Sequence, residues 1–250
     1  MTIWVCGNSQ SRALLKGLGA ISDVGADVRA FVLGNAKYEL TDFSRIDQGT
    51  VNVTVEEYAR NLESATGKPY FNKEDVWGLC QGTHNARIFR HEFWNNCDPS
   101  DIADRRRRPI SLAILDALIE ADQKYIKLFH RRLCETGTRF FVVSCPPARA
   151  DHPCVQDGTR PEAIVYIDKR ARLLMKEHLE KLGVMFVDYP PEAATPEGLL
   201  RPEYYAADRP GVKDAHHANP EYGMMMMRRV LAFLSSDRID PLVSRKIGTA

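Results

Sequence analysis

Short apolar runs of strand length alternate along this chain with longer amphipathic segments of helical length. The runs that predict strands lie at 3–6, 28–33, 76–80, 139–144 and 184–187. Such alternation is typical of a parallel sheet whose two faces are covered by helices. The pattern therefore predicts the α/β class, as a three-layer α/β/α sandwich around a mainly parallel, five-stranded sheet.

Three helices are predicted by apolar side chains at helical spacing, over 110–136, 162–182 and 220–234. Gly137 and Gly183 stand where the first two helices should end. The segment 38–66 is ambiguous, because TVNVTV is typical of a strand and EEYARNLES of a helix. We interpret residues 1–250 as a single domain, with an insertion beside the main sheet around 38–70.

The formal net charge of +1 gives no general attraction to nucleic acid or to an anionic membrane. We therefore expect neither as a partner, and we interpret the arginine run at 105–108 as a solvated loop before a helix. No segment is typical of a secretion signal or of a membrane span. The six cysteines form no CxxC pair, so we expect no disulfide framework or zinc site, and Cys6, Cys80 and Cys145 are interpreted as small core residues. A reducing cytoplasm is the expected compartment.

Chemistry in an open parallel sheet is expected where strands lead into helices. Gly7, Asn8 and Ser9 follow the first strand, and a helix is predicted from about Ser11. Ser9 is either a helix cap or a nucleophile, and this turn alone does not decide between the two roles.

A second signal precedes the last helix, in the sequence DAHHANP. Asn219 and Pro220 are a typical N-cap and first-turn pair, which puts His217 in the preceding loop. The three-residue step from Asp214 lets the carboxylate contact the imidazole and orient it. One loop can thus supply a base and its orienting group. The alternative is that these residues only form a turn and cap the helix.

Together, GNSQ, GTHN and DAHHAN resemble the first, third and fifth sequence blocks of the SGNH or GDSL-like hydrolase superfamily, in the same order and over nearly the whole chain. The resemblance implies an SGNH hydrolase-like, flavodoxin-like fold, with Ser9 as nucleophile, His217 as base and Asp214 as its partner. Asn8 stands where the family frequently has aspartate. Block three usually reads GxND, so His84 or Asn85 would be the side-chain donor to the oxyanion, with Asn85 preferred.

Further oxyanion donors implied by the resemblance are the backbone N–H groups of Ser9 and of Gly34, with Gly49 as a poorer candidate. Pro146 and Pro147 are similar to the family's fourth region. The implied function is a serine esterase that uses no cofactor and no metal and removes a small acyl group, such as acetyl, from a small molecule or a saccharide. Polar and aromatic residues after the third block could contact a sugar or cover the sheet edge: Arg87, Arg90, His91, Trp94, Asn95 and Asn96.

Two other functions fit the same residues. The first is an acyltransferase that uses acetyl-coenzyme A and a saccharide acceptor, although no glycine-rich phosphate loop supports coenzyme A binding. The second is a carbohydrate-binding protein that has kept the scaffold without catalysis, which the altered GTHN block would allow.

Overall fold

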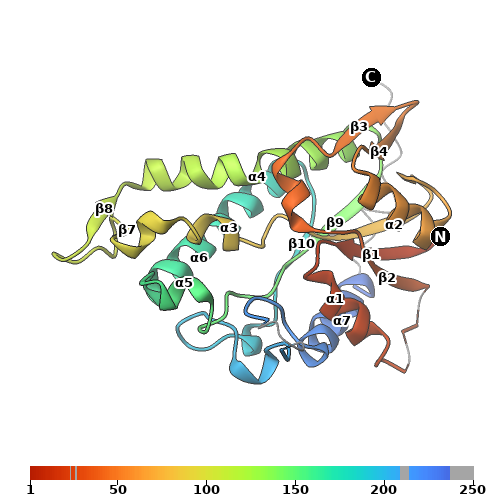
Figure 1. Cartoon of the computed structure of the whole chain (residues 1–250). Helices are drawn as coiled ribbons and strands as arrows, with labels where there is room; N and C mark the ends of the chain where they lie inside the picture. The colour runs from red at the N-terminus through yellow and green to blue at the C-terminus, as the bar shows by residue number, and fades with distance from the viewer. Residues whose placement is uncertain (23, 26, 209–213, 237–250) are drawn as a thin grey trace.

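A computed structural model describes residues 1–22, 24–25, 27–208 and 214–236. Five parallel strands form the central sheet: β1 (Ile3–Gly7), β2 (Val28–Val32), β6 (Val76–Cys80), β9 (Arg139–Val143) and β10 (Phe186–Val187). Their spatial order is β10-β9-β6-β1-β2 (Figure 1). The predicted α/β class and five-stranded parallel sheet are confirmed.

The strand order places β1 inside the sheet, between β6 and β2. From β1 the chain runs outward to β2 and then returns to β6 on the opposite side of β1. Gly7 at the end of β1 pairs with Val32 of β2 and Cys80 of β6. Ligands bind beyond the strand ends where the direction of winding reverses, so the loops after β1, β2 and β6 should frame a site.

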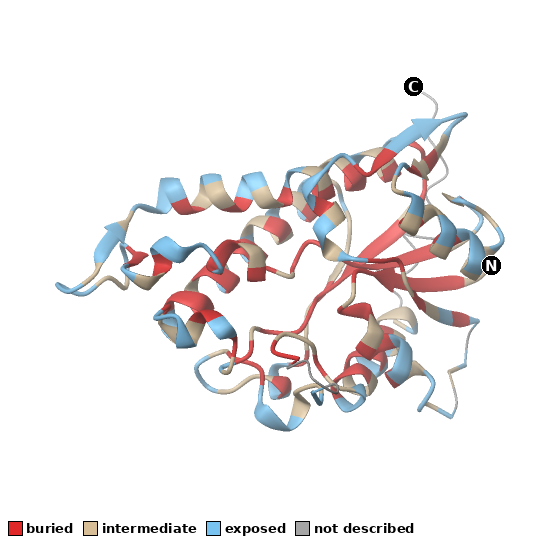
Figure 2. Cartoon of the chain, viewed as in Figure 1, coloured by how far each residue is buried: buried red, intermediate tan, exposed pale blue. Residues whose placement is uncertain are grey.

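Two layers of helices cover the sheet (Figure 1). Helices α1 (Ser11–Leu18) and α7 (Pro220–Leu234) pack on one face, and α2 (Glu56–Thr66), α4 (Leu112–Glu135) and α6 (Pro161–Lys181) pack on the other. Strand β1 alternates between the layers, with Ile3 and Val5 in the first core and Trp4 and Cys6 in the second. Both faces of β1 are therefore buried, as Figure 2 shows for the central strands.

The predicted helices agree with α4, α6 and α7 to within about two residues at each end. As predicted, Asn219 caps α7, with its side chain accepting from the Tyr222 N–H at 3.0 Å, and Pro220 opens the helix. Cys6, Cys80 and Cys145 are buried, in keeping with a packing role. Across the described part of the chain, no helix is long and apolar enough to cross a membrane.

The ambiguous segment contains both a strand and a helix. After the 3-10 helix η1 (Ala36–Leu40), strands β3 (Ser44–Asp47), β4 (Thr50–Val53) and β5 (Tyr70–Phe71) form a separate antiparallel sheet, with α2 between β4 and β5. Gln48 and Gly49 make the tight β3–β4 turn, both with positive φ. Gly49 therefore turns a hairpin of this second sheet, whereas Gly34 follows β2 in the main sheet. That the segment is an insertion in a single domain stays a prediction.

Helices α4 and α6 extend beyond the sheet and carry a third apolar cluster (Figure 1). The short elements there are α3 (Ala86–Phe89), η2 (Glu92–Asn95), β7 (Cys97–Pro99), β8 (Arg108–Ile110) and α5 (Pro153–Gln156); η3 (Pro191–Ala193) and η4 (Pro202–Tyr204) lie in the connection to α7. The arginine run is not uniformly solvated. Arg107 donates to the Asn95 carbonyl at 2.7 Å and pairs with buried Asp98, which the expectation of a solvated loop missed.

Two glycines set the distance between α1 and α7. A Cβ on Gly17 would lie 2.1 Å from the Gly223 carbonyl carbon, and one on Gly223 would lie 1.8 Å from the Ala13 carbonyl oxygen. The helix backbones thus touch directly, with no side chain between them. Because α1 follows the Ser9 turn and α7 follows the His217 loop, this contact fixes how closely the two loops approach.

We expect Gly223→Ala to lower the free energy of unfolding by about 1–3 kcal/mol, because the added methyl group meets backbone atoms that can only move with the helix. Urea unfolding measures this change. Gly19→Ala is the matched control, since Gly19 ends the partner helix α1 with φ −63° and an added Cβ there would be 3.6 Å from its nearest neighbour. Equal stability of the two variants would contradict the close helix contact.

Candidate active site

Ser9 lies in the turn between β1 and α1, and its side chain does not cap the helix. The cap residue of α1 is Gln10, whose N–H donates to the Asn8 side-chain oxygen at 3.0 Å. The Ser9 hydroxyl instead contacts Nε2 of His217 at 2.9 Å, across 208 residues of sequence. Of the two roles left open by the sequence, the capping role is therefore wrong for Ser9.

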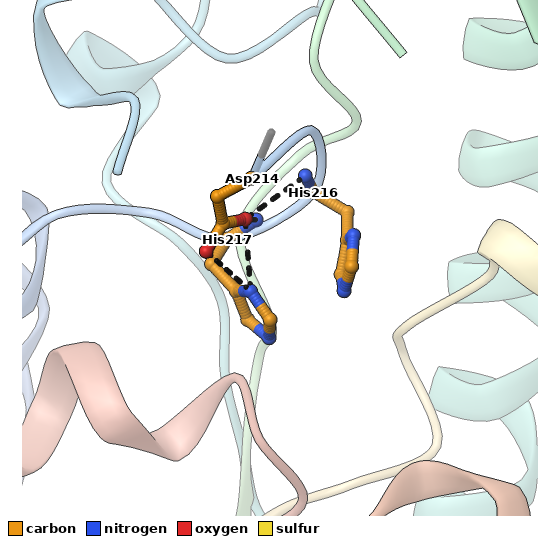
Figure 3. Close-up of side chains that lie close together, drawn as sticks. All are labelled: Asp214, His216 and His217. Atoms are coloured by element: carbon orange, nitrogen blue, oxygen red, sulfur yellow. Dashed lines mark hydrogen bonds and ion pairs between the residues drawn. The ribbon is translucent and has the colours of Figure 1, made fainter. Parts of the chain in front are cut away.

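His217 is held by the carboxylate of Asp214. Its Nδ1 lies 2.9 Å from both Oδ1 and Oδ2 of Asp214, as the dashed lines in Figure 3 mark. The backbone N–H of His217 also donates to Oδ1 at 3.1 Å. With Nδ1 facing the carboxylate, Nε2 is left facing the serine hydroxyl.

The pKa of Asp214 reflects this pairing. Burial alone would raise it, but the charge of His217 and the hydrogen bonds from the His217 and His216 backbone lower the pKa below its ordinary value. Asp214 is therefore ionised at neutral pH, where it favours the charged form of His217.

Two side chains tie the histidine loop to the rest of the molecule. Gln10, next to Ser9, donates from Nε2 to the His216 carbonyl at 3.1 Å. Arg149 donates to the His217 carbonyl at 3.3 Å and forms a two-point ion pair with Asp151. The loop is thus fixed on the serine side and from the segment after β9.

Three further histidines surround this group. Burial, reinforced by nearby positive charges, lowers the pKa of His216 to about 4 and that of His152 to about 4, and it lowers the pKa of His84 well below its ordinary value. All three are neutral at pH 7. In this group of four histidines, His217 is the one whose ring is hydrogen-bonded to a carboxylate.

A hollow of about 440 Å³ opens beside the serine, lined in part by Ser9 and Gly34. Within the described residues, neither the Ser9 N–H nor the Gly34 N–H donates to a protein acceptor. Gly34 has no room for a side chain, since a Cβ would lie 2.6 Å from the Tyr58 ring and 2.7 Å from Glu57 Oε1. Both residues thus line the hollow with an N–H group that no described protein acceptor uses.

The two block-three residues differ in their surroundings. The Asn85 amide nitrogen donates to Asp168 at 2.8 Å, and the side chain is buried. Both ring nitrogens of His84 are buried and, among the described residues, have no hydrogen-bond partner. The His84 ring lies 5.8 Å from that of His216. Asn85 is therefore engaged with α6, whereas His84 has an unused donor near the histidine loop.

Asn8, where the family often has aspartate, contacts a buried carboxylate. Its Nδ2 donates to Glu39 Oε1 at 2.9 Å, and Glu39 is fully buried. Arg87 links Glu39 to Asp122, with contacts of 3.3 Å and 2.8 Å. Burial raises the pKa of Glu39, although Arg87 and Asn8 act against this rise. An amide suits position 8 because it donates to this carboxylate, which an aspartate could not do when ionised.

We expect Asn8→Asp to lower the free energy of unfolding by about 3 kcal/mol at pH 8, because two carboxylates would then share a buried site. The loss should be smaller at pH 5. A carboxylate whose pKa is raised by folding binds its proton more tightly in the folded state, so lowering the pH favours folding. Urea unfolding at both pH values measures this, with exposed Asn96→Asp as the control. A loss independent of pH would contradict this explanation.

One group of described residues could ligate a metal ion: ligand atoms of Asp214, His216 and His217 lie within 4.8 Å of one another. Both oxygens of Asp214 already contact Nδ1 of His217, so an ion would have to break that contact. The donor set fits a base and its orienting carboxylate better. Figure 3 marks no contact from the His216 ring, although the centroid of this ring lies 4.1 Å from that of the His217 ring.

Sequence reasoning missed Glu39 and Asp168. Glu39 lies 31 residues from Asn8, and no local spacing links them. Asp168 could have been found, because it lies on the apolar face of a predicted helix with Arg172 four residues later, and the two form a buried ion pair of 2.7 Å. The sugar-contact expectation is wrong for Trp94, which is fully buried and donates to the Ile88 carbonyl.

The fold defines the class of this protein: the chain has the fold of the SGNH or GDSL-like hydrolases. The resemblance predicted from the sequence is thus confirmed at the level of the fold. No protein-family model and no curated protein matches the sequence.

Among solved structures, a candidate SGNH hydrolase from Slackia heliotrinireducens aligns over 94% of this chain and 99% of its own, with a TM-score of 0.51 and 12% identity. A candidate lipolytic protein of the G-D-S-L family from Desulfitobacterium hafniense aligns over 93% and 99%, with a TM-score of 0.50 and 9% identity. A candidate platelet activating factor from Streptococcus pneumonia aligns over 93% and 83%, with a TM-score of 0.51 and 13% identity. At these identities the similarity establishes the fold.

Proposed function

We propose that this protein is a serine acyl hydrolase that removes a small acyl group from an alcohol. The contact of 2.9 Å between Ser9 Oγ and His217 Nε2, with Nδ1 on the ionised Asp214, carries the proposal. A hydroxyl, an imidazole and a carboxylate in series are the components needed to activate a serine. The shared fold with candidate SGNH and G-D-S-L proteins adds support.

In the proposed reaction, Ser9 Oγ attacks the ester carbonyl while His217 Nε2 takes the hydroxyl proton. Asp214 stabilises the resulting imidazolium. As the tetrahedral intermediate collapses, His217 gives that proton to the departing alcohol, leaving Ser9 acylated. Water then attacks the acyl-enzyme with His217 again as base, which releases the carboxylic acid and restores Ser9.

The developing oxyanion would be stabilised by the N–H groups of Ser9 and Gly34. For the side-chain donor we now prefer His84 to Asn85, because the Asn85 amide nitrogen is engaged with Asp168. A neutral imidazole can donate from one nitrogen, and burial keeps His84 neutral. The preference for His84 predicts that His84→Ala impairs hydrolysis more than Asn85→Ser does.

Two hollows, one lined by Ser9 and the other by His84 and His216, support a small acyl group on a larger, polar alcohol. A recess of about 20 Å³ is lined by His84, His216, Pro146 and Pro147 among others, and its volume is about that of one water molecule. An acetyl methyl group would fit this recess and a long acyl chain would not. The 440 Å³ hollow beside Ser9 has polar lining from Asn35, Asn61 and Ser64, which suits the hydroxyl groups of a saccharide.

The proposal is tested by labelling with a serine-directed phosphonate, followed by peptide mapping, and by comparing acetyl, butyryl and octanoyl esters. We expect label on Ser9 and fastest hydrolysis of the acetyl ester. Label elsewhere, or none, would contradict the proposal and favour a non-catalytic binding protein. Adding acetyl-coenzyme A and a saccharide acceptor, and measuring acetylated product, tests transfer as the alternative outcome.

A further inference from the structure

Arg12 lines the 440 Å³ hollow together with Ser9 and Gly34. It lies in the first turn of α1, three residues after the serine, and it is half-buried. Arg12 and the proposed nucleophile thus line the same hollow, in which we place the alcohol part of the substrate.

The guanidinium group of Arg12 has no hydrogen-bond or ion-pair partner among the described residues. Each of the other described arginines that is buried or half-buried donates to at least one protein acceptor. The other described arginines without a hydrogen bond are exposed to water. Removing a charge from water without pairing it costs free energy. Among the buried and half-buried arginines of the described residues, Arg12 is the one whose N–H donors have no protein acceptor.

Arg12 is the cation among the residues that line the hollow. Glu57 also faces the hollow, but its Oε1 accepts from the Asn35 N–H at 3.1 Å and lies against Gly34. No ion pair joins Glu57 to Arg12 within the part of the chain that the structure describes. The first turn of α1 has no acidic residue, so the positive end of the helix adds to the field of the guanidinium. Asn61 and Ser64 supply further polar groups for hydroxyls.

We infer that Arg12 binds an anionic group, a carboxylate or a phosphate, on the alcohol part of the substrate, so that the protein prefers acyl esters of acidic saccharides. The inference rests on the proposed function, because it takes Ser9 as the reacting atom. A guanidinium group binds either anion through two parallel N–H donors, which the single ammonium of lysine cannot reproduce.

The test measures how well three glycosides protect Ser9 from the phosphonate: methyl glucoside, methyl glucuronide and methyl glucoside 6-phosphate. We expect one or both anionic glycosides to protect at concentrations at least about tenfold lower than the neutral glycoside. In Arg12→Met this preference should fall about tenfold to a hundredfold, and Arg12→Lys should keep part of it. Which anion protects identifies the source of the charge.

Lys16→Met is the matched control, since Lys16 is an exposed cation on the same helix. It should retain the preference of the unmodified protein. Equal protection by all three glycosides, or equal weakening of all three in Arg12→Met, would overturn the inference while labelling of Ser9 still supported the hydrolase. If Ser9 is not labelled, the proposed hydrolase fails, and calorimetric binding of the three glycosides to the unmodified protein and to Arg12→Met tests Arg12 by itself.

Discussion

Replacing Ser9 by alanine should lower kcat/KM for a short acetyl ester by about 10³- to 10⁶-fold, because the atom that attacks the carbonyl is removed. The remaining hydrolysis would come from the oxyanion donors and from substrate binding alone. The same substitution should abolish labelling by the phosphonate. Initial rates on purified protein, with active-site titration of the parent, give the measurement.

The loss of rate reports on the role of Ser9 in the reaction only if the Ser9→Ala protein still folds. Ser9 is half-buried, and its replacement removes one hydrogen bond, so we expect stability to change by less than about 1 kcal/mol. Ser22→Ala is the control, since Ser22 is an exposed serine after the same helix. A folded Ser9→Ala protein that hydrolyses the ester as fast as the Ser22 variant would refute the role of Ser9.

Asp214→Asn should reduce kcat by about 10⁴-fold while leaving the fold in place. An amide at position 214 cannot stabilise the imidazolium, and it can donate to Nδ1 of His217, which would put the remaining ring proton on Nε2, the atom that must accept from Ser9. His217→Ala should cost at least as much. Steady-state kinetics should be measured at a pH above the range of histidine titration. Protonation of the base then does not contribute to the loss of rate.

The rate losses from substituting these three residues should not be additive. Because they act as one unit, Ser9→Ala combined with His217→Ala should be little worse than Ser9→Ala alone. His178→Ala is the control, since His178 lies on α6 and lines neither hollow, and we expect an effect below about tenfold. Losses from Ser9 and His217 that add independently would mean that the two side chains do not cooperate.

The sequence predicted the framework well because it is encoded by local periodicity. The apolar runs that became β1 and β6 and the spacing that became α4 each lie in one stretch of chain, so neighbouring residues carry the signal. The last strand was predicted at 184–187 but spans only Phe186–Val187. The antiparallel sheet of β3, β4 and β5 was not predicted, because pairing with β5 depends on residues beyond the α2 helix.

The candidate site divides in the same way. Asp214 and His217 are three residues apart, so their contact follows from one loop, and the choice of both could be made from the sequence. The partners of Asn8 and Asn85 could not be predicted, since Glu39 and Asp168 lie 31 and 83 residues away. The sequence also does not show that Arg12 lacks a protein partner, because the pairing of an arginine depends on tertiary contacts.

By itself, then, the sequence determined which groups are present and in which kind of turn each lies: a serine after the first strand, an Asp–His step before the last helix, and a glycine after the second strand. Only the tertiary structure decided that Ser9 meets His217 at 2.9 Å, that Asn85 is held by Asp168, and that Arg12 faces the hollow without a partner. The physical reason is that these relations depend on strand order and on the direct contact of α1 with α7 at Gly17 and Gly223. Both arise from packing between segments far apart in the chain, which local residue spacing does not encode.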